Sequence, residues 1–230
     1  MRPTVVLFDV DGTLLSAGGA GRRALERAFA AHCGTSAPLH ELRFNGMTDP
    51  GIVRAGLEQL GRRVEPRLVA AILDDYLGLL GEELERATGF TVHPGVTALL
   101  DDLADGRIAI GLGTGNLRDG ARLKVERAGL AAYFPFGGFG SDHEDRAELL
   151  RIGAARGAER LGQPLERCRV VVVGDTPLDV GAAVAIGAAS LGVATGGFTP
   201  DVLRAAGATW AVEDLTAPAA REVFREGERA

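Results

Sequence analysis

Several residue types that mark particular protein classes are scarce in this chain of 230 residues. Its two cysteines, Cys33 and Cys168, lie far apart without CxxC spacing, and its four histidines have no metal-ligand spacing, so the sequence favours a reducing compartment and no zinc. No run of about 18 apolar residues occurs, and the apolar stretch near the amino terminus is too short for a signal-peptide core. These absences predict a cytoplasmic protein with no membrane partner.

Positive charge is also sparse. The chain has 25 basic and 31 acidic residues, a net charge of −6, and the basic residues are scattered rather than grouped. Only one of them, Lys124, is a lysine. Without a basic stripe or a polybasic patch, we expect no nucleic-acid partner.

Continuous apolar segments alternate with helical ones through most of the chain, which is typical of a parallel sheet covered by helices. This pattern predicts an α/β fold with a Rossmann-like, doubly wound parallel sheet. The charged carboxyl-terminal residues 221–230 are expected to fray. The predicted strands are residues 5–8, 107–113, 170–173, 188–193 and 208–212, and the predicted helices between them are residues 94–105, 117–128, 144–161 and 178–186.

Residues 16–93 differ from the rest, since they show helical periodicity and no convincing buried strand. They predict an inserted helical module, with hinges at residues 16–21 and 89–95. The α/β core then consists of residues 1–15 and 94–230. Helices are expected within the module at residues 21–32, 50–60 and 66–86.

Two aspartates, Asp9 and Asp11, directly follow the first predicted strand and precede Gly12-Thr13-Leu14. Side chains at i and i+2 of an extended segment point the same way, so both can face one pocket at the carboxyl end of the strand, where open α/β sheets bind ligands. Two carboxylates this close need a cation or a proton between them. The alternative, ordinary surface aspartates at a strand end, fits less well because the DxDGT pattern is demanding.

Two other predicted strands also end in polar residues. Thr114 is followed by Gly115 and Asn116, whose small size and backbone amides suit an oxyanion. A dinucleotide loop is the alternative, although GxGxxG requires glycine where Asn116 stands. Asp175 and Asp179 follow the most apolar strand, and Asp179 can instead be an acid in the first turn of a helix.

These motifs, in this order, resemble the haloacid dehalogenase superfamily, specifically its members with a helical cap after the first strand, such as phosphoglycolate-phosphatase-like enzymes and β-phosphoglucomutase. The family's DxDGT motif matches residues 9–13, its strand-ending Thr matches Thr114, and its GDxxxD motif matches residues 174–179. The resemblance extends to about residue 193. It implies that the inserted module, residues 16–93, is the cap domain.

The resemblance also implies a mechanism. Asp9 would be the nucleophile that forms an aspartyl-phosphate, and Asp11 would protonate the leaving oxygen and then deprotonate the attacking water. Mg²⁺ would be bound by Asp9, the backbone carbonyl of Asp11 and Asp175, while Asp179 would orient water on the metal. The phosphoryl group would be held by the end of the second strand: Thr114, Gly115 and Asn116.

The family's third motif, usually a lysine, is where this sequence departs. Arg146 stands at that place, in the loop at residues 140–146, whose acids can alternatively only cap the next helix. Lys124 lies about 10 Å beyond the start of a helix expected to run away from the strand ends. We therefore expect Arg146 to offset the phosphoryl charge and Lys124 to pair with a surface acid such as Glu126 or Glu159.

Substrate choice is expected to lie in the cap, where residues 44–49 would face the phosphoryl site and Thr48 would contact the substrate. Alternatively, Thr48 or Asp49 only caps the helix that begins at Pro50. A cap that closes over the site implies a small soluble substrate and the exclusion of water.

The resemblance narrows the chemistry further. Family members that cleave carbon–halogen bonds lack the acid at Asp11, and those that cleave phosphonates need a cap lysine that residues 16–93 do not contain. The sequence thus predicts a Mg²⁺-dependent phosphatase, monomeric or homodimeric, acting on a small phosphorylated metabolite such as a phosphoglycolate-like compound or a sugar phosphate. A sugar phosphomutase, or a non-catalytic binding protein on the same fold, are the alternatives.

Overall fold

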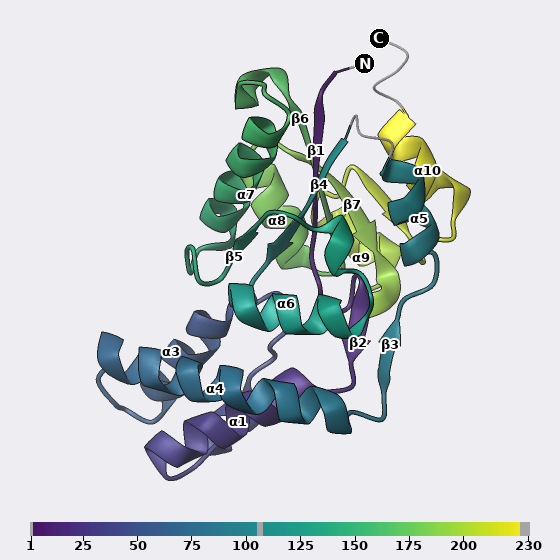
Figure 1. The fold of residues 1–230 in the computed structure, drawn as a ribbon. Coiled ribbons are helices and arrows are strands. Elements are labelled where there is room, and N and C mark those ends of the chain that lie inside the picture. The colour runs from purple at the N-terminus through teal and green to yellow at the C-terminus, as the bar shows by residue number, and fades with distance from the viewer. Residues whose placement is uncertain (1, 105–107, 226–230) are drawn as a thin grey trace.

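Parallel strands form the central sheet of the protein in a computed structural model that describes residues 2–104 and 108–225 (Figure 1). The strand order is β5-β4-β1-β6-β7-β8, so the chain adds strands first on one side of β1 and then on the other. The doubly wound parallel sheet predicted from the sequence is confirmed. Its strands are β1 (Thr4–Phe8), β4 (Ile108–Thr114), β5 (Gly137–Phe139), β6 (Arg169–Gly174), β7 (Ala189–Val193) and β8 (Trp210–Val212).

Helices cover both faces of this sheet, which explains why β1 is a continuous apolar run. Val5 and Leu7 pack in one hydrophobic cluster with α7 and α8, whereas Val6 and Phe8 pack on the opposite face with α5 and α6. The bounds of the core helices are α5 (Val96–Leu103), α6 (Arg118–Arg127), α7 (Arg146–Arg160), α8 (Pro177–Ala185), α9 (Pro200–Ala205) and α10 (Pro218–Arg225), with short 3₁₀ turns at η1 (Ala131–Tyr133), η2 (Leu165–Arg167) and η3 (Ala194–Gly196).

Several parts of the core differ from the sequence prediction, which did not include the helices α9 and α10. The strand β5 was not expected, because its Gly-Gly-Phe sequence has no apolar run; a Cβ at Gly138 would lie 1.8 Å from the Leu149 carbonyl oxygen of α7, so this close packing requires glycine. Residues 221–225 are helical rather than frayed, since Val223 and Phe224 are buried. The predicted ends at residues 105 and 107 and the tail at residues 226–230 lie outside the described residues.

Helices α1–α4, which we call the cap layer, lie beyond the carboxyl edge of the sheet (Figure 1). An antiparallel ribbon of β2 and β3 joins this layer to the core, where the sequence predicted only hinges. No helix within residues 2–104 and 108–225 has both the length and the apolar character needed to cross a membrane. The remaining elements are α1 (Ala20–Cys33), α2 (Ala37–Glu41), α3 (Asp49–Gln59), α4 (Pro66–Arg86), β2 (Leu15–Ala17) and β3 (Phe90–Val92).

Candidate active site

The carboxyl ends of three neighbouring strands meet beneath the cap layer. Asp9 follows β1, Thr114 ends β4 and Asp175 follows β6, and all three residues are buried. The backbone N–H of Asp9 donates to the Val173 carbonyl at 2.9 Å, which extends the pairing of β1 with β6 up to the site. Because the strand order reverses at β1, these ends border the crevice where doubly wound sheets bind ligands.

Three carboxylates gather in this crevice. Asp9, Asp175 and Asp179 each place an oxygen within 4.8 Å of the other two. Asp175 accepts a hydrogen bond from the Thr13 hydroxyl at 2.9 Å through Oδ1, whereas its buried Oδ2 has no hydrogen-bond partner among the described residues. Carboxylate oxygens are the ligands that Mg²⁺ prefers, so these three carboxylates, with one buried oxygen lacking a partner, fit a divalent cation.

The pKa values of the cluster reflect its excess negative charge. Burial, followed by the charges of Asp179 and Asp9, raises the pKa of Asp175 to about 8. Burial raises the pKa of Asp9 to about 6, although the Arg146 guanidinium opposes the shift. A bound cation would relieve the same repulsion and keep the carboxylates ionised.

Gly12 allows the loop after β1 to approach this cluster. Its φ is 86°, in the left-handed region that favours glycine, and a Cβ there would lie 2.5 Å from Oδ2 of Asp175. The glycine of the DxDGT motif therefore brings the backbone against Oδ2 of Asp175, the oxygen that lacks a partner among the described residues.

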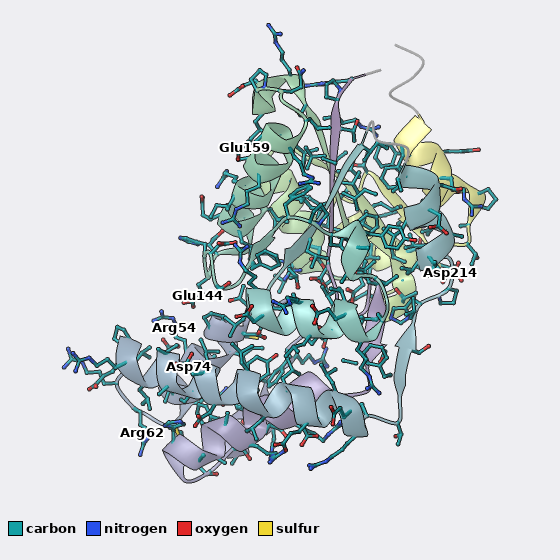
Figure 2. The ribbon with its side chains drawn as sticks, viewed as in Figure 1. Arg54, Arg62, Asp74, Glu144, Glu159 and Asp214 are labelled. Carbon is teal, nitrogen blue, oxygen red and sulfur yellow. The ribbon has the colours of Figure 1, made fainter. Side chains whose placement is uncertain are left out.

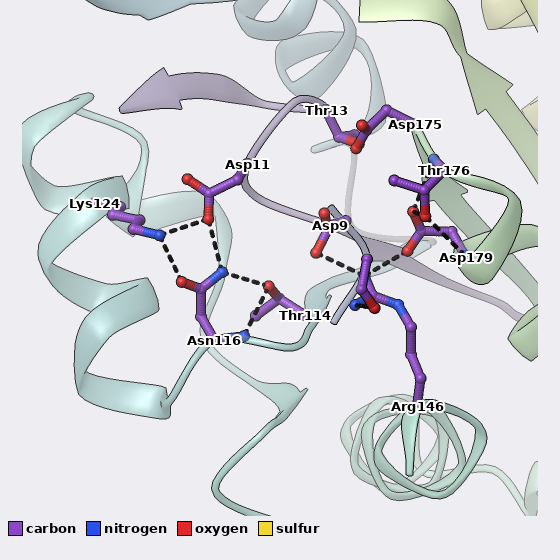
Figure 3. A network of polar contacts seen from close by, with 11 residues as sticks. Asp9, Asp11, Thr13, Thr114, Asn116, Lys124, Arg146, Asp175, Thr176 and Asp179 are labelled. Carbon is purple, nitrogen blue, oxygen red and sulfur yellow. Dashed lines mark hydrogen bonds and ion pairs between the residues drawn. The ribbon is translucent and has the colours of Figure 1, made fainter. Parts of the chain in front are cut away.

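Arg146, the first residue of α7, projects from the opposite side of the crevice (Figure 3). Its Nη2 lies 2.9 Å from Oδ1 of Asp9 and also pairs with Asp179, and its Nη1 donates to the Gly46 carbonyl of the cap layer at 3.1 Å. Burial would lower the pKa of Arg146, but Asp179 and Asp9 outweigh it and the pKa is raised. The acid before it, Asp145, caps α7 through the backbone N–H groups of the first turn.

Asp179 caps a helix and also faces the carboxylate cluster. Its Oδ2 accepts hydrogen bonds from the Thr176 N–H at 3.0 Å and the Thr176 hydroxyl at 2.7 Å, which makes a capping box at the start of α8. Its Oδ1 pairs with Arg146. The same side chain thus fixes the helix start and faces the cluster.

The carboxylate of Asp11 turns away from the other three and contacts Lys124 and Asn116 (Figure 3). The expectation that Lys124 pairs with a surface acid was wrong, since Lys124 is buried and its Nζ lies 2.5 Å from Oδ2 of Asp11. The reason is the direction of α6, which runs across the carboxyl edge of the sheet, next to α4, rather than away from it (Figure 1). Distance along that helix is therefore not distance from the site.

The cap segment at residues 44–49 does face the crevice, but Thr48 does not. The Thr48 hydroxyl accepts from the Gly51 N–H and donates to the Glu144 carbonyl, both at 3.2 Å, so it is the N-cap of α3 and does not line the cavity that contains Asp9 and Asp11. Its neighbour Asp49 lines the cavity instead. The alternative of a helix cap thus describes Thr48, while its contact with a substrate stays a prediction.

The cavity between the core and the cap layer has a volume of about 280 Å³. Besides the predicted Asp9, Asp11, Thr114, Gly115, Asn116 and Arg146, its walls include Asp49 of the segment expected to face the site, and two cap side chains that the sequence did not single out, Arg22 and Tyr76.

Asp49 also joins the cap layer to the core. Its N–H donates to the Gly115 carbonyl and its Oδ2 accepts from the Leu117 N–H, both at 2.8 Å. Burial raises the pKa of Asp49 to about 6, partly offset by Lys124, and burial raises the pKa of Tyr76 above its usual range. The signal available in the sequence was the helix-cap motif at residues 48–51, which does not reveal contacts with a distant strand end.

A further contact crosses between the cap layer and the core. Arg54 of α3 makes a bidentate ion pair with Glu144 of the core, with nitrogen–oxygen distances of 2.8 to 3.1 Å. Figure 2 shows these two labelled residues on either side of the boundary between the cap layer and the core. Together with the bonds of Asp49 and Arg146, this pair holds the cap layer against the strand ends.

The carboxylate cluster thus lies at the switch point of a doubly wound α/β sheet. Residues 3–187 match the model of the haloacid dehalogenase-like hydrolase family, and the chain belongs to this family. The resemblance recognised in the motifs is thus confirmed.

Solved structures share the whole fold at low sequence identity. A hydrolase from Pseudomonas syringae is 20% identical with a TM-score of 0.68, and the match covers 100% of both chains. A predicted phosphatase from Clostridium acetobutylicum is 20% identical with a TM-score of 0.67, covering 98% of this chain and 100% of that one. CbbY from Rhodobacter sphaeroides, solved in complex with phosphate, is 19% identical with a TM-score of 0.68, covering 94% and 95%. No curated protein matches the sequence.

Proposed function

We propose that this hydrolase is a Mg²⁺-dependent phosphatase that acts on a small phosphorylated metabolite through an aspartyl-phosphate. The observation that carries the proposal is the meeting of Asp9, Asp175 and Asp179 beside Arg146, with the buried Oδ2 of Asp175 left without a hydrogen-bond partner among the described residues. A carboxylate can attack an anionic phosphate ester only where positive charge offsets that of the phosphoryl oxygens. The phosphate bound to CbbY, which has the same fold, supports this chemistry.

In the proposed reaction Asp9 attacks phosphorus, the bond to the leaving oxygen breaks, and the proton of Asp11 passes to that oxygen to release an alcohol. Water then attacks the aspartyl-phosphate, its proton returns to Asp11, and inorganic phosphate leaves. Mg²⁺, held by Asp9, the Asp11 backbone carbonyl and Asp175, would supply charge neutralisation when bound. Asp179 would orient water there.

Thr114, Gly115 and Asn116 at the end of β4 would hold the phosphoryl oxygens, with Arg146 opposite. We further propose that the cap layer acts as a separate cap domain, residues 16–93, which opens to admit substrate and closes to exclude water from a core of residues 1–15 and 94–230. The cavity of about 280 Å³ is small for a ligand site, which favours a compact metabolite.

Incubation with a broad panel of phosphate esters and Mg²⁺, with and without a chelator, tests the proposal. We expect Mg²⁺-dependent release of inorganic phosphate and transient labelling of Asp9 by ³²P-labelled substrate. An isomerised sugar phosphate without net phosphate release would instead indicate a phosphomutase. No turnover of any ester and no label would indicate a non-catalytic protein.

The Asp9→Asn variant makes the test specific to the nucleophile. Asparagine fits the same space but is a poor nucleophile, so we expect turnover to fall below detection while the circular dichroism spectrum and the unfolding transition are retained. Retention of activity in this variant would refute the assignment of Asp9.

A further inference from the structure

Lys124, the only lysine of the chain, occupies a buried place in the core that the proposed reaction does not use. Its side chain is 4% exposed and its Nζ lies 2.5 Å from Oδ2 of Asp11 and 2.6 Å from Oδ1 of Asn116. Burying an ammonium group costs much free energy unless it is paired, so the contacts with Asp11 and Asn116 are needed to keep Lys124 in this place.

The three side chains form a closed set of hydrogen bonds (Figure 3). Asn116 donates from Nδ2 to the same Oδ2 of Asp11 at 2.9 Å and to the Thr114 hydroxyl at 2.8 Å. Asp11 is thus tied through one oxygen to α6 and to the end of β4. Among residues 2–104 and 108–225 no hydrogen bond reaches its Oδ1, which remains the oxygen available to a ligand.

Asp11 needs such a restraint more than the other acids of the site do. Its side chain is 42% exposed and lines the cavity, whereas Asp9 and Asp175 are buried. A group that transfers a proton must lie within hydrogen-bond reach of the leaving oxygen, and misplacement by about 1 Å can cost about 10²-fold in rate.

We propose that Lys124 is a positioning residue, which with Asn116 holds the Asp11 carboxyl group in place for proton transfer to the leaving oxygen. The inference rests on the proposed phosphatase function, and it adds a role for a residue outside the motifs. Oδ2 of Asp11 can accept these two hydrogen bonds whether or not Oδ1 carries a proton, so the contacts do not occupy the oxygen that faces a ligand.

The dependence of the rate on the leaving group tests this role. p-Nitrophenolate is a weak base that leaves without a proton, whereas the alkoxide of glycerol 2-phosphate must be protonated as the ester bond breaks. The value of kcat/KM reports the steps up to formation of the aspartyl-phosphate. In Lys124→Met we expect kcat/KM for glycerol 2-phosphate to fall by about 10- to 100-fold, part of the ~10²–10⁴-fold contribution of general acid catalysis.

For p-nitrophenyl phosphate we expect kcat/KM of Lys124→Met to stay within about threefold of wild type. Hydrolysis of the aspartyl-phosphate still needs Asp11 as a base, so kcat should fall and a burst of p-nitrophenol should appear. Lys124→Arg, which keeps a donor, should restore part of the loss on the alkyl ester. Arg122→Met removes a cation from the same helix, where it pairs with Glu126 on the surface, and should match wild type on both esters.

Other outcomes overturn the proposal. Equal losses of kcat/KM on both esters would show that Lys124 has only a structural role, and a raised KM with unchanged kcat would place it in substrate binding. A properly folded Lys124→Met protein with wild-type kinetics would show that Asp11 needs no such restraint. If wild-type protein turns over no ester of the broad panel and Asp9 takes no label, the proposed function fails, and this inference fails with it.

Discussion

Replacing Asp175 with asparagine separates the electrostatic cost of the carboxylate cluster from its use in metal binding. Asparagine has the same shape and can still accept the hydrogen bond from the Thr13 hydroxyl, but it carries no charge. The pKa of Asp175 is about 8 against an ordinary value of 3.8, chiefly because of burial and then because of Asp179 and Asp9. At about 1.4 kcal/mol for each pKa unit, this shift destabilises the metal-free protein near pH 7.5 by up to about 5 kcal/mol.

Part of this cost comes from repulsion that Asp9 and Asp179 share, so removing one charge recovers less than the whole of it. We therefore expect Asp175→Asn to stabilise the metal-free protein by about 2 to 4 kcal/mol near pH 7.5. The sign follows from linkage. Because the pKa of Asp175 is raised on folding, the folded protein binds more protons than the unfolded chain between about pH 4 and pH 8, and its stability falls as pH rises through that range. The stability of Asp175→Asn should therefore change less with pH over this range than that of wild type.

Urea unfolding in the presence of a chelator, at about pH 5 and about pH 8, measures this difference. Added Mg²⁺ should then stabilise wild type, by about 2.7 kcal/mol at a hundredfold excess over Kd, and should stabilise Asp175→Asn far less. Asp201→Asn is the matched control, since its side chain is 92% exposed and pairs with the nearby Arg204. The reasoning is refuted if Asp175→Asn is less stable than wild type near pH 8 without metal, or if Mg²⁺ stabilises both proteins equally.

Two further predictions concern contacts between the cap layer and the core. A Cβ at Gly115 would lie 2.3 Å from the Met47 carbonyl oxygen, so Gly115→Ala should lower kcat/KM by at least about tenfold without a large change in Tm. The control is Gly78→Ala, where an added Cβ would meet no atom of another element within 4 Å and kcat/KM should stay unchanged. Steady-state kinetics and thermal unfolding check this, and normal activity in Gly115→Ala would show that the cap layer need not seat there. Arg54 and Glu144 are 47% and 37% exposed, so Arg54→Met should cost at most about 1 kcal/mol of stability. At low salt the variant should have a severalfold higher KM than wild type. Because salt screens the ion pair, the KM of wild type should rise toward that of the variant as the salt concentration increases. A KM unaffected by the substitution at every salt concentration would contradict it.

Most of the sheet could be predicted because its buried strands are visible in the sequence as apolar runs. The strands β1 and β6 are buried on both faces, so they are unbroken apolar runs, and the acids that follow them converge because parallel strands end on one edge. The strand β5 could not be predicted, since its Gly137 and Gly138 have no side chains to reveal a strand and are required by packing against other elements. Such a strand is defined by its neighbours rather than by its own residues.

The cap side of the site was harder to predict for a related reason. The motif residues Asp9, Thr114 and Asp175 reach the site directly from their own strand ends, so local sequence determines where they lie. Asp49 and Tyr76 reach it only because α3 and α4 pack over the sheet, and nothing in their local sequence sets that distance. Their roles depend on contacts between segments far apart in the chain.

Lys124 shows that part of this long-range information is nevertheless present in the sequence. It lies on the buried face of α6 with Gly120, Ala121 and Val125, a spacing that the helical period makes visible. The residues three and four positions away on either side, which share its face of the helix, include no acid, and Glu126 lies two positions away on another face. A lysine on an apolar face without an acid of its own helix must find its partner elsewhere in the fold, because an unpaired ammonium group is too costly to bury. The nearest strand end that carries acids is that of β1, so the combination of helical period and charge pairing leads to Asp11, whereas the rise along the helix alone led away from it.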